Sequence, residues 1–329
     1  MPQAVRILGA GRHEPARLVL SDVYDKRYGK EPGWTERATG VAQRRFVGEG
    51  ETASAMAESA ARKALAAAGI EARALSAIIG ACGVMEQPIP GTSVLLHRRL
   101  GLAESGVPAF DVNATCLSFL CALELAAMRI GAGAWERVLV FSSDVASAAL
   151  NEDDPATGPL FGDGAAAIVL GRCDNGSALL SWRMETYSEG AETSWLGAGG
   201  SRLPARDLDA LLAESVFRMD GARAYRIAAA HVEAFLEKLL NEAHASLDDI
   251  ACVAPHQASG HALALMKTRL GLNDGRVVEI LRECGNQVAT SMPSALAYAI
   301  EQGRVVRGDK VLLLGTGAGV SLGGAVMVY

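Results

Sequence analysis

The hydrophobic positions of the chain follow two periods that alternate along it. Residues 107–114 and 138–144 are short apolar runs typical of strands, whereas residues 116–130 repeat apolar side chains with the spacing of a helix. Apolar β-rich runs that alternate with helical runs favour mainly parallel sheets covered by helices on both faces. The pattern therefore predicts an α/β protein.

The same order of elements occurs twice. Residues 64–81 and 239–256 each give a helix end, a turn, a short apolar helix and a β-rich run. About 175 residues also separate two segments that begin with Ala-Thr and continue as helices, 114–126 and 289–301. Self-similarity at one spacing indicates a duplication, so we expect two similar α/β halves.

The expected halves divide the chain after residue 171. Residues 1–171 would form the first half, and residues 172–329 would form the second half together with its linker. Residues 172–220 have no counterpart in the repeat and contain the glycine-rich segment GAGGS. We expect them to supply the linker and the loops that cover the substrate.

Composition and charge narrow the class of protein. Of the 329 residues, 50% are hydrophobic and only 21% are charged, so the chain can bury a large core and does not have the composition of a disordered protein. The net charge of −6 disfavours nucleic acid as the main partner, because phosphate binding needs a basic face.

The sequence predicts a cytoplasmic protein without a membrane segment. No run approaches the roughly 20 apolar residues of a membrane span, and the N-terminal residues lack the apolar core of a signal peptide. The six cysteines include no CxxC pair and no His/Cys cluster of metal-ligand spacing, so no metal site is expected. In a reducing compartment, most of them should be small buried residues.

One cysteine has a distinctive position. Cys116 lies where the apolar strand 107–114 gives way to the helical run 116–130. At a helix N-terminus, unpaired N–H groups and the macrodipole favour a thiolate, which would lower the pKa of the thiol and supply a nucleophile. The alternative is a small core residue at a strand–helix junction, which is the commoner role for a lone cysteine. Cys121, in the middle of the same run, has no such help.

Two polar residues stand at comparable places in the second half. His256 follows the apolar strand 250–254, and Asn286 follows a glycine directly before the repeated helix. Taken alone, His256 is more often structural, and a turn or cap would explain Asn286. The duplication places His256 opposite Ala81 and Asn286 opposite Asp111, at the ends of equivalent strands. Sites of α/β proteins form at such strand ends.

Five motifs are spread over essentially the whole chain: DVNATCLSF (111–119), FGDGAAAIVL (161–170), APHQAS (254–259), CGNQVATSMPSAL (284–296) and GTGAGVSLGG (315–324). In order and spacing they resemble the β-ketoacyl-acyl-carrier-protein synthase III family of the thiolase superfamily. The combination of Cys, His and Asn is the specific signal. Long-chain elongating ketosynthases use Cys-His-His instead, and thiolases have a second catalytic cysteine in the C-terminal glycine loop.

The resemblance implies a thiolase-like fold, a duplicated αβαβα layered arrangement of two similar halves, and it implies a chemistry. Cys116 would take an acyl group from a thioester, and a malonyl thioester would lose CO₂ to give an enolate that attacks the acyl-enzyme. His256 and Asn286 would donate hydrogen bonds to the enolate oxygen, and the backbone N–H groups of Cys116 and Gly319 would form the oxyanion hole. No metal or redox cofactor is implied.

The resemblance also implies partners. The substrates would be acyl thioesters of coenzyme A or of acyl carrier protein, and the protein would be a homodimer in which Ile89 reaches the active site of the other subunit. Familiar members carry arginines where this chain has Ala38 and Pro155, so the identity of the donor stays open. The substrate-binding residues would be Trp34, Ile89, Phe161, Met219 and Ser259.

Three functions follow. The first is decarboxylative condensation of an acyl primer with malonyl-acyl carrier protein or malonyl-coenzyme A, in fatty-acid initiation or a related specialised pathway. The second keeps the acyl-cysteine but is an acyltransferase or a non-decarboxylating Claisen condensing enzyme. Relatives of the non-decarboxylating kind use a glutamate base, and Glu86 lies near the right loop in a different register. The third is a non-catalytic partner in a synthase complex, against which the complete Cys-His-Asn set speaks.

Overall fold

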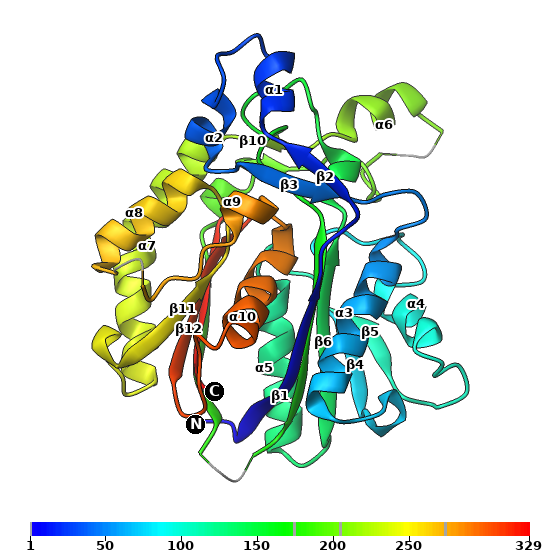
Figure 1. Cartoon of the computed structure of the whole chain (residues 1–329), viewed down its shortest axis with the longest axis vertical. Coiled ribbons are helices and arrows are strands. Elements are labelled where there is room, and N and C mark those ends of the chain that lie inside the picture. The colour runs from blue at the N-terminus through cyan, green and yellow to red at the C-terminus, as the bar shows by residue number, and fades with distance from the viewer. Residues whose placement is uncertain (1, 174–175, 204–205, 273–274) are drawn as a thin grey trace.

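The computed structural model describes residues 2–173, 176–203, 206–272 and 275–329 and shows five layers, helix–sheet–helix–sheet–helix (Figure 1). One large sheet is built entirely from strands within residues 5–172, and the other from strands within residues 178–328. The thiolase-like αβαβα fold expected from the sequence is therefore confirmed. In the described part of the chain, no helix is both long and apolar enough to cross a membrane.

The first sheet has five strands in mixed orientation. β4 is parallel to β5 and to β6, whereas β7 is antiparallel to β6 and to β1. The order across the sheet is β1 (Val5–His13), β7 (Gly164–Arg172), β6 (Arg137–Asp144), β4 (Ala77–Gly80) and β5 (Ala109–Asp111).

The second sheet repeats this topology. β11 is parallel to β12, β13 is antiparallel to β12, and β8 is antiparallel to β13, so β8-β13-β12-β11 matches β1-β7-β6-β4 in order and direction. A parallel bridge from Val253 to Val277 stands where β5 would be. The strands are β11 (Ile250–Pro255), β12 (Lys310–Gly317), β13 (Ser321–Val328) and β8 (Ala178–Thr186).

Two expectations from the sequence need correction here. The sheets are mixed rather than mainly parallel, because β6 leads to β7 and β12 to β13 without a crossover helix, and such connections give antiparallel pairs. Part of the segment 172–220 also has a counterpart after all. Its first strand, β8, is the equivalent of β1, and its half-buried pattern lacks the continuous apolar run that marks a central strand.

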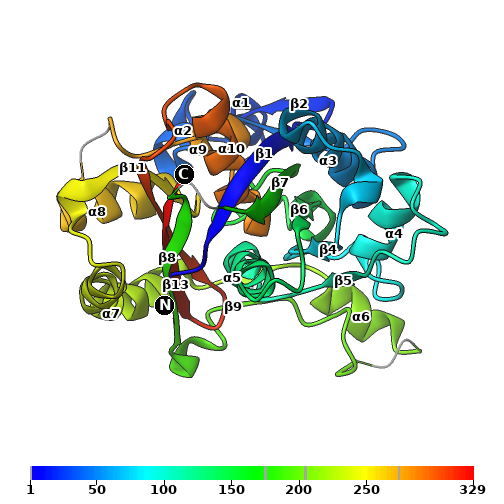
Figure 2. The ribbon, with the colours of Figure 1, turned by 90° about the horizontal axis from the view of Figure 1, so that it is seen from below.

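The inner helix layer is shared by both sheets. α5 (Ser118–Gly131) and α10 (Ser291–Glu301) lie between the sheets in Figures 1 and 2, and one buried cluster joins their apolar side chains to strands of both halves. α5 consists mostly of Ala, Leu, Phe and other apolar residues, so it can be buried on several faces at once. Each buried Leu or Phe stabilises the fold by about 1.5–3 kcal/mol. The apolar side chains of this shared layer therefore hold the two halves together.

The outer helices repeat in the same way. α3 (Ala53–Ala68) and α4 (Thr92–Arg99) cover the first sheet, and α7 (Gly221–Glu242) and α8 (Gly260–Leu270) cover the second (Figure 1). Close packing sets the choice of residue in β1. A Cβ atom at Gly11 would lie 2.6 Å from both Ala60 O and Lys63 Cβ, so only glycine lets this strand approach α3.

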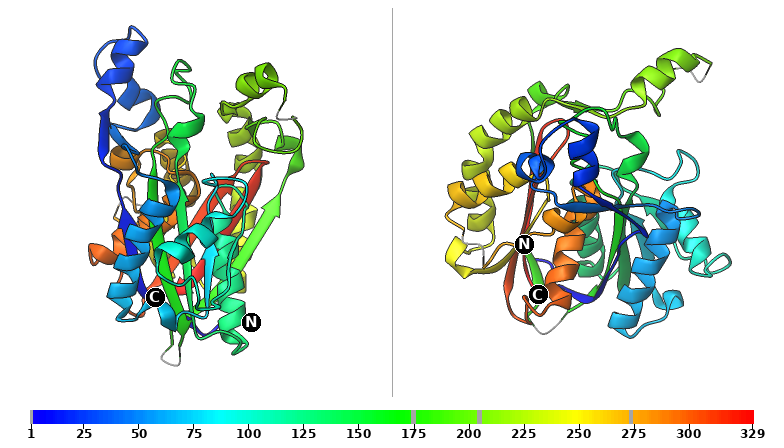
Figure 3. Two further views of the ribbon diagram at one scale, coloured as in Figure 1. Left: turned by 90° about the vertical axis from the view of Figure 1, so that its right-hand side faces the viewer. Right: turned by 45° about the horizontal axis from the view of Figure 1, so that its top comes forward.

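The remaining elements gather at one end of the layers, at the top of Figure 1. Within them, α6 stands away from the two sheets, as both views in Figure 3 show. They are β2 (Arg17–Leu20), α1 (Asp22–Arg27), α2 (Trp34–Thr39), β3 (Gln43–Phe46), β9 (Ser194–Trp195), α6 (Leu208–Glu214), β10 (Arg218–Met219) and α9 (Leu281–Cys284).

Candidate active site

The Cys116 turn joins β5 to α5 through a strained backbone. Thr115 has a φ of 54°, which is rare for a β-branched residue. The side chain of Asn113 accepts a hydrogen bond from the Thr115 N–H at 2.8 Å. Ser118 Oγ accepts from the Ala114 N–H at 2.9 Å and donates to the Thr115 carbonyl at 2.7 Å. These bonds hold the strain next to the cysteine, as is common at functional sites.

The structure corrects the expected acidity of Cys116. The residue lies two positions before the first residue of α5, outside the helix proper, and is only partly exposed. Desolvation, followed by the negative charge of Asp144, raises the pKa of the Cys116 thiol to about 12, although backbone N–H groups of Cys116 and Ala318 oppose the shift. The expectation of a lowered pKa is wrong, because burial and a nearby carboxylate outweigh the helix terminus.

The end of β12 brings the cysteine and the histidine together. A Cβ atom at Gly317 would lie 3.0 Å from Thr115 Oγ1, so this glycine packs against the Cys116 turn. A Cβ atom at Gly315 would lie 2.8 Å from His256 Cβ and 3.3 Å from Leu117 Cδ2. The two glycines thus let the loops of both halves close on the same strand end.

His256 directly follows β11 and is held neutral by burial. Its backbone N–H donates to the Leu314 carbonyl on β12 at 2.9 Å, and the residue is 6% exposed. Desolvation lowers the pKa of His256 to about 4. Its Nδ1 atom is buried and has no hydrogen-bond partner among the described residues. Near neutral pH the imidazole is therefore uncharged and can donate through only one ring nitrogen.

Gln257 was not identified from the sequence, yet it ties the histidine loop to the segment that leads to Asn286. Its Oε1 atom accepts from the N–H groups of Ile280 and Leu281, both at 3.0 Å. Its Nε2 atom donates to the carbonyls of Pro255 and Val278, also at 3.0 Å. A buried amide with four hydrogen bonds rigidifies the segments that it joins. In the sequence, only its position next to His256 could have pointed to Gln257.

Asn286 is clamped from both sides by the segment 160–162. Its N–H donates to the Leu160 carbonyl and its carbonyl accepts from the Gly162 N–H, each at 3.0 Å. Its side-chain Nδ2 donates to the Ala258 carbonyl at 3.2 Å. The expectation that Asn286 stands at a strand end is wrong, because α9 intervenes after the strand-like segment that pairs with β11.

One backbone donor to the thiol comes from the loop that contains Gly319. The Ala318 N–H donates toward the Cys116 sulfur and lowers the pKa of the thiol, as does the N–H of Cys116 itself. Gly319, the next residue, has a φ of 122°, which favours glycine strongly. Gly319 therefore shapes the turn, while Ala318 presents its amide to the sulfur.

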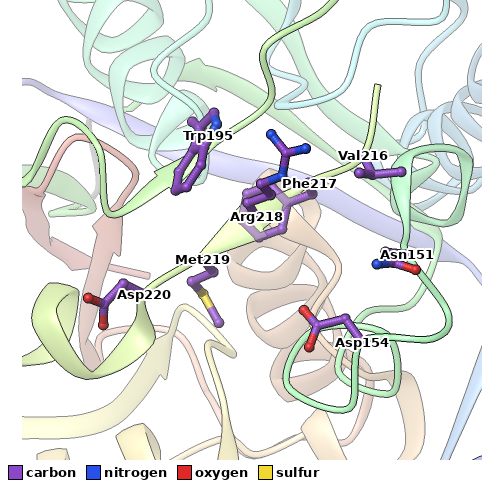
Figure 4. Close-up of a pocket in the computed structure, with 8 residues that line it drawn as sticks. All are labelled: Asn151, Asp154, Trp195, Val216, Phe217, Arg218, Met219 and Asp220. Carbon is purple, nitrogen blue, oxygen red and sulfur yellow. The ribbon is translucent and has the colours of Figure 1, made fainter. Parts of the chain in front are cut away.

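A pocket of about 400 Å³ is lined by residues from the segments 151–154, 195 and 216–220, and Cys116, His256 and Asn286 are not part of its lining (Figure 4). Met219 and Phe217 belong to its lining and to the same apolar cluster as Phe161 and Val288. Phe161 stacks edge-on against Phe217 with ring centroids 5.3 Å apart, and it forms a backbone bridge with Asn286. The lining is completed by Asn151, Asp154, Trp195, Val216, Arg218 and Asp220.

The other residues suggested by the sequence are placed in different ways. Ser259 caps α8 by accepting from the Ala262 N–H at 3.2 Å, so its hydroxyl has a structural task. Trp34 begins α2, whose end packs against the start of α8 through Gly40 and Gly260. The Lys30 ammonium lies 5.4 Å from the Trp34 ring centroid.

Two further residues lie on the flank of the first half. Glu86 accepts a hydrogen bond from the Ser54 N–H at 2.6 Å, so its carboxylate caps the first turn of α3. A carboxylate at a helix N-terminus is stabilised there, which gives Glu86 a structural role. Ile89 is 85% exposed, so its side chain lies on the surface of this chain and outside its core. Among the described residues, no three His, Cys, Asp or Glu side chains are grouped to hold a metal ion.

Comparison with known proteins finds one family. A family model described as 3-oxoacyl-[acyl-carrier-protein (ACP)] synthase III matches residues 110–188, and its C-terminal counterpart matches residues 240–329. A β-ketoacyl-[acyl-carrier-protein] synthase III of Laribacter hongkongensis is 36% identical over the full length of both chains. An acetoacetyl CoA synthase of a Streptomyces species is 34% identical over 98% of each chain. The crystal structure of the Aquifex aeolicus 3-oxoacyl-[acyl-carrier-protein] synthase III superposes with a TM-score of 0.89 at 29% identity, covering 99% of this chain and 100% of that one.

The lowered pKa of His256 predicts how stability depends on pH. The unfolded chain binds a proton on this histidine below about pH 6.5, whereas the folded chain does so only below about pH 4. His256 by itself should therefore lower the free energy of unfolding by about 2 kcal/mol from pH 7 to pH 5, and the raised pKa of Asp144 offsets part of this fall in the whole protein. Between pH 7 and pH 5, the free energy of unfolding of His256→Gln, measured by urea denaturation, should fall by about 2 kcal/mol less than that of the wild type. Equal losses in both proteins would contradict a buried neutral imidazole.

Proposed function

The chain belongs to the 3-oxoacyl-[acyl-carrier-protein] synthase III family of condensing acyltransferases, and we propose that it condenses an acyl group carried on Cys116 with a malonyl thioester, releasing CO₂. The observation that carries the proposal is the surrounding of the thiol. Two backbone N–H groups donate toward the sulfur, neutral His256 packs on the same end of β12 as the Cys116 turn, and Asn286 is hydrogen-bonded to Ala258, two residues after the histidine. Such neutral donors suit a reaction in which negative charge develops on oxygen only transiently.

In the acylation step, the Cys116 sulfur attacks the carbonyl carbon of the donor thioester. The S–C bond of the acyl-enzyme forms, the donor's C–S bond breaks, and the proton of the thiol ends on the departing thiol. We propose that the N–H groups of Cys116 and Ala318 stabilise the oxyanion of this step. The Ala318 N–H supports this choice because it donates toward the sulfur that carries the acyl group, and the Gly319 N–H suggested by the sequence is the other candidate donor of the same loop.

In the condensation step, the malonyl thioester loses CO₂ and the resulting enolate attacks the acyl carbon on Cys116. His256 and Asn286 donate to the enolate oxygen in this proposal. The histidine is suited to this role because burial keeps it neutral, so no charge has to be removed before it donates. The clamp on the Asn286 backbone keeps the amide in place while the substrate charge changes.

The substrates reach Cys116 as acyl thioesters of coenzyme A or of acyl carrier protein, which would be a protein partner. We place the thioester arm along the pocket that contains Met219, because Phe217 of its lining packs on Phe161, which pairs with Asn286. Trp34 begins α2, whose end packs against the start of α8, where Ser259 is the N-cap, and in this proposal the two helices flank the approach. The non-decarboxylating alternative gains no support from Glu86, whose carboxylate is occupied by the Ser54 N–H.

We further propose that two copies of the chain form a dimer along β5. β5 is the outer strand of the first sheet, and an outer strand offers unpaired N–H and C=O groups to a second chain. The flank beside it, at the right of Figure 2, carries three exposed apolar side chains, Met85, Ile89 and Val94. An isoleucine that is 85% exposed is better explained by burial against a partner than by contact with water.

The nucleophile is tested by comparing two cysteines of the same region. Cys116→Ala should abolish the acyl adduct that forms with an acyl thioester, whereas Cys121→Ala should keep it. Cys121 lies within α5 and has its sulfur 3.8 Å from Met184 Sδ, away from the backbone donors. Intact-protein mass spectrometry reads out both, and an adduct on the Cys116→Ala protein would sink the assignment.

The two half-reactions should separate in variants of the donors. His256→Ala and Asn286→Ala should slow CO₂ release from a malonyl thioester by about 10² to 10³, while Cys116 still accepts an acyl group. His97→Ala, on α4, serves as the control and should decarboxylate normally. Normal decarboxylation with failed onward transfer of the acyl group would instead favour an acyltransferase in which His256 activates an acceptor.

The dimer is tested by placing a charge at the exposed flank. Ile89→Arg should give a monomer in light scattering and lose condensation activity, because a buried unpaired charge disfavours association. Val306→Arg changes another exposed apolar residue, 58% exposed, and should leave the protein dimeric and active. A monomeric wild-type protein that is fully active at the assay concentration would refute the dimer.

A further inference from the structure

Asp144, the last residue of β6, is a fully buried carboxylate with an unusual set of partners. Its Oδ1 atom accepts from the N–H groups of Gly83 and Val84, both at 2.7 Å. Its Oδ2 atom accepts from the N–H of Thr290 at 2.9 Å and from its Oγ at 2.8 Å. All four donors are neutral, and no Lys, Arg or His of the described residues forms an ion pair with it. Burial raises the pKa of Asp144 to about 6 even so, which leaves it charged near neutral pH.

The donors on one side support the Cys116 turn. A Cβ atom at Gly83 would lie 3.4 Å from the Thr115 carbonyl oxygen, so the loop of Gly83 and Val84 packs directly behind the residue that precedes the cysteine. On its other side the same atom would lie 2.6 Å from Val288 Cγ1. A shift of this loop would therefore move both the Cys116 turn and the segment that follows Asn286.

The donor on the other side belongs to the Asn286 segment. Thr290 ends the short helical turn Val288–Thr290 that follows Asn286 and leads into α10. It is 146 residues from Asp144 in sequence, so the carboxylate connects the two halves of the chain. Val288, within this turn, has a φ of 52° and so carries strain of the kind seen at Thr115.

The charge of Asp144 also reaches the nucleophile. After desolvation, Asp144 is the main cause of the raised pKa of the Cys116 thiol. The other titratable group that it acts on is the buried thiol of Cys82, whose pKa it also raises. The groups that face the carboxylate from the 83–84 loop and from Thr290 are neutral donors, so its effect on the sulfur is not cancelled by a neighbouring cation.

We propose that Asp144 is a positioning residue for both sides of the site. Its carboxylate ties the loop behind the Cys116 turn to the segment that carries Asn286, and it places one negative charge, unpaired among the described residues, behind that turn. Its effect on condensation rests on the proposed function, whereas its effect on the thiol does not.

The first test measures the thiol directly. The rate at which iodoacetamide alkylates Cys116 is followed from pH 7 to pH 9.5 by peptide mass spectrometry, which separates Cys116 from Cys82 and Cys121. Asp144→Asn removes the charge with little change of shape, so its alkylation rate at a given pH should rise by roughly tenfold. Asp163→Asn is the matched control, because Asp163 is equally buried and accepts from Val47 and Ser147 but does not act on the Cys116 thiol.

The second test measures condensation. In Asp144→Asn an NH₂ group must face either Thr290 or the 83–84 loop, so at least one donor loses its acceptor and condensation should fall by about tenfold or more. Thr290→Val removes one donor and keeps the charge. It should slow condensation severalfold while the alkylation of Cys116 stays unchanged.

The outcomes decide between a positioning role and a merely structural one. Faster alkylation with slower condensation in Asp144→Asn supports the proposal, and so does slower condensation alone in Thr290→Val. Alkylation of Asp144→Asn within about twofold of the wild type, or an equal rise in Asp163→Asn, would overturn it. Should Asp144→Asn not fold, Asp144→Ser, whose small hydroxyl can still accept, takes its place. A wild type that does not condense malonyl thioesters would refute the proposed function but leave the alkylation test valid.

Discussion

The packing of α5 and α10 between the two sheets is the contact on which the rest of the structure depends. Each helix touches strands of both halves, so neither sheet can bury its inner face without the other half of the chain. Because both helices begin at the same end of the layers, the turns before them meet there. Cys116 precedes α5 and Asn286 precedes α10, and the shared layer thus brings the turns that carry these two residues to the same end of the molecule.

The site that results is built from neutral groups around one buried charge. The thiol is kept protonated, the imidazole is kept uncharged, and the ionised group, Asp144, makes no ion pair with a described residue. This differs from a site in which a thiolate and an imidazolium stand ready as a pair. Apart from Asp144 these groups carry no charge near neutral pH, and the backbone N–H groups of Cys116 and Ala318 donate toward the sulfur.

Polar residues outside the reacting set hold this arrangement. Gln257 bonds the histidine loop to the start of α9. The segment 160–162 bonds both backbone groups of Asn286, and Asp144 joins loops of the two halves. All are buried and hydrogen-bonded, and a buried network that satisfies its members rigidifies a site. The strained backbone at Thr115 is held by Asn113 and Ser118, and that at Val288 by the N–H that it donates to Asn286 Oδ1.

Much of this protein could be predicted from local features of its sequence. The alternation of strand and helix periods, the repeat, and the position of Cys116 at a strand–helix junction depend on residues that are close together in the chain, and the structure has the corresponding elements. The family motifs pointed to the fold, which the structure confirms, and to Cys116, His256 and Asn286 as the reacting set.

What only the tertiary structure decided concerns groups that are distant in sequence. The helix terminus suggested a lowered pKa for Cys116, but burial and a carboxylate 28 positions away raise it. The donation of the Ala318 N–H toward the thiol, across 202 positions of sequence, could not be predicted either. β8 takes the place of β1 in the second sheet although its sequence matched nothing in the first half. Desolvation, charge and strand pairing are properties of the packed chain, and no local pattern of residues specifies them.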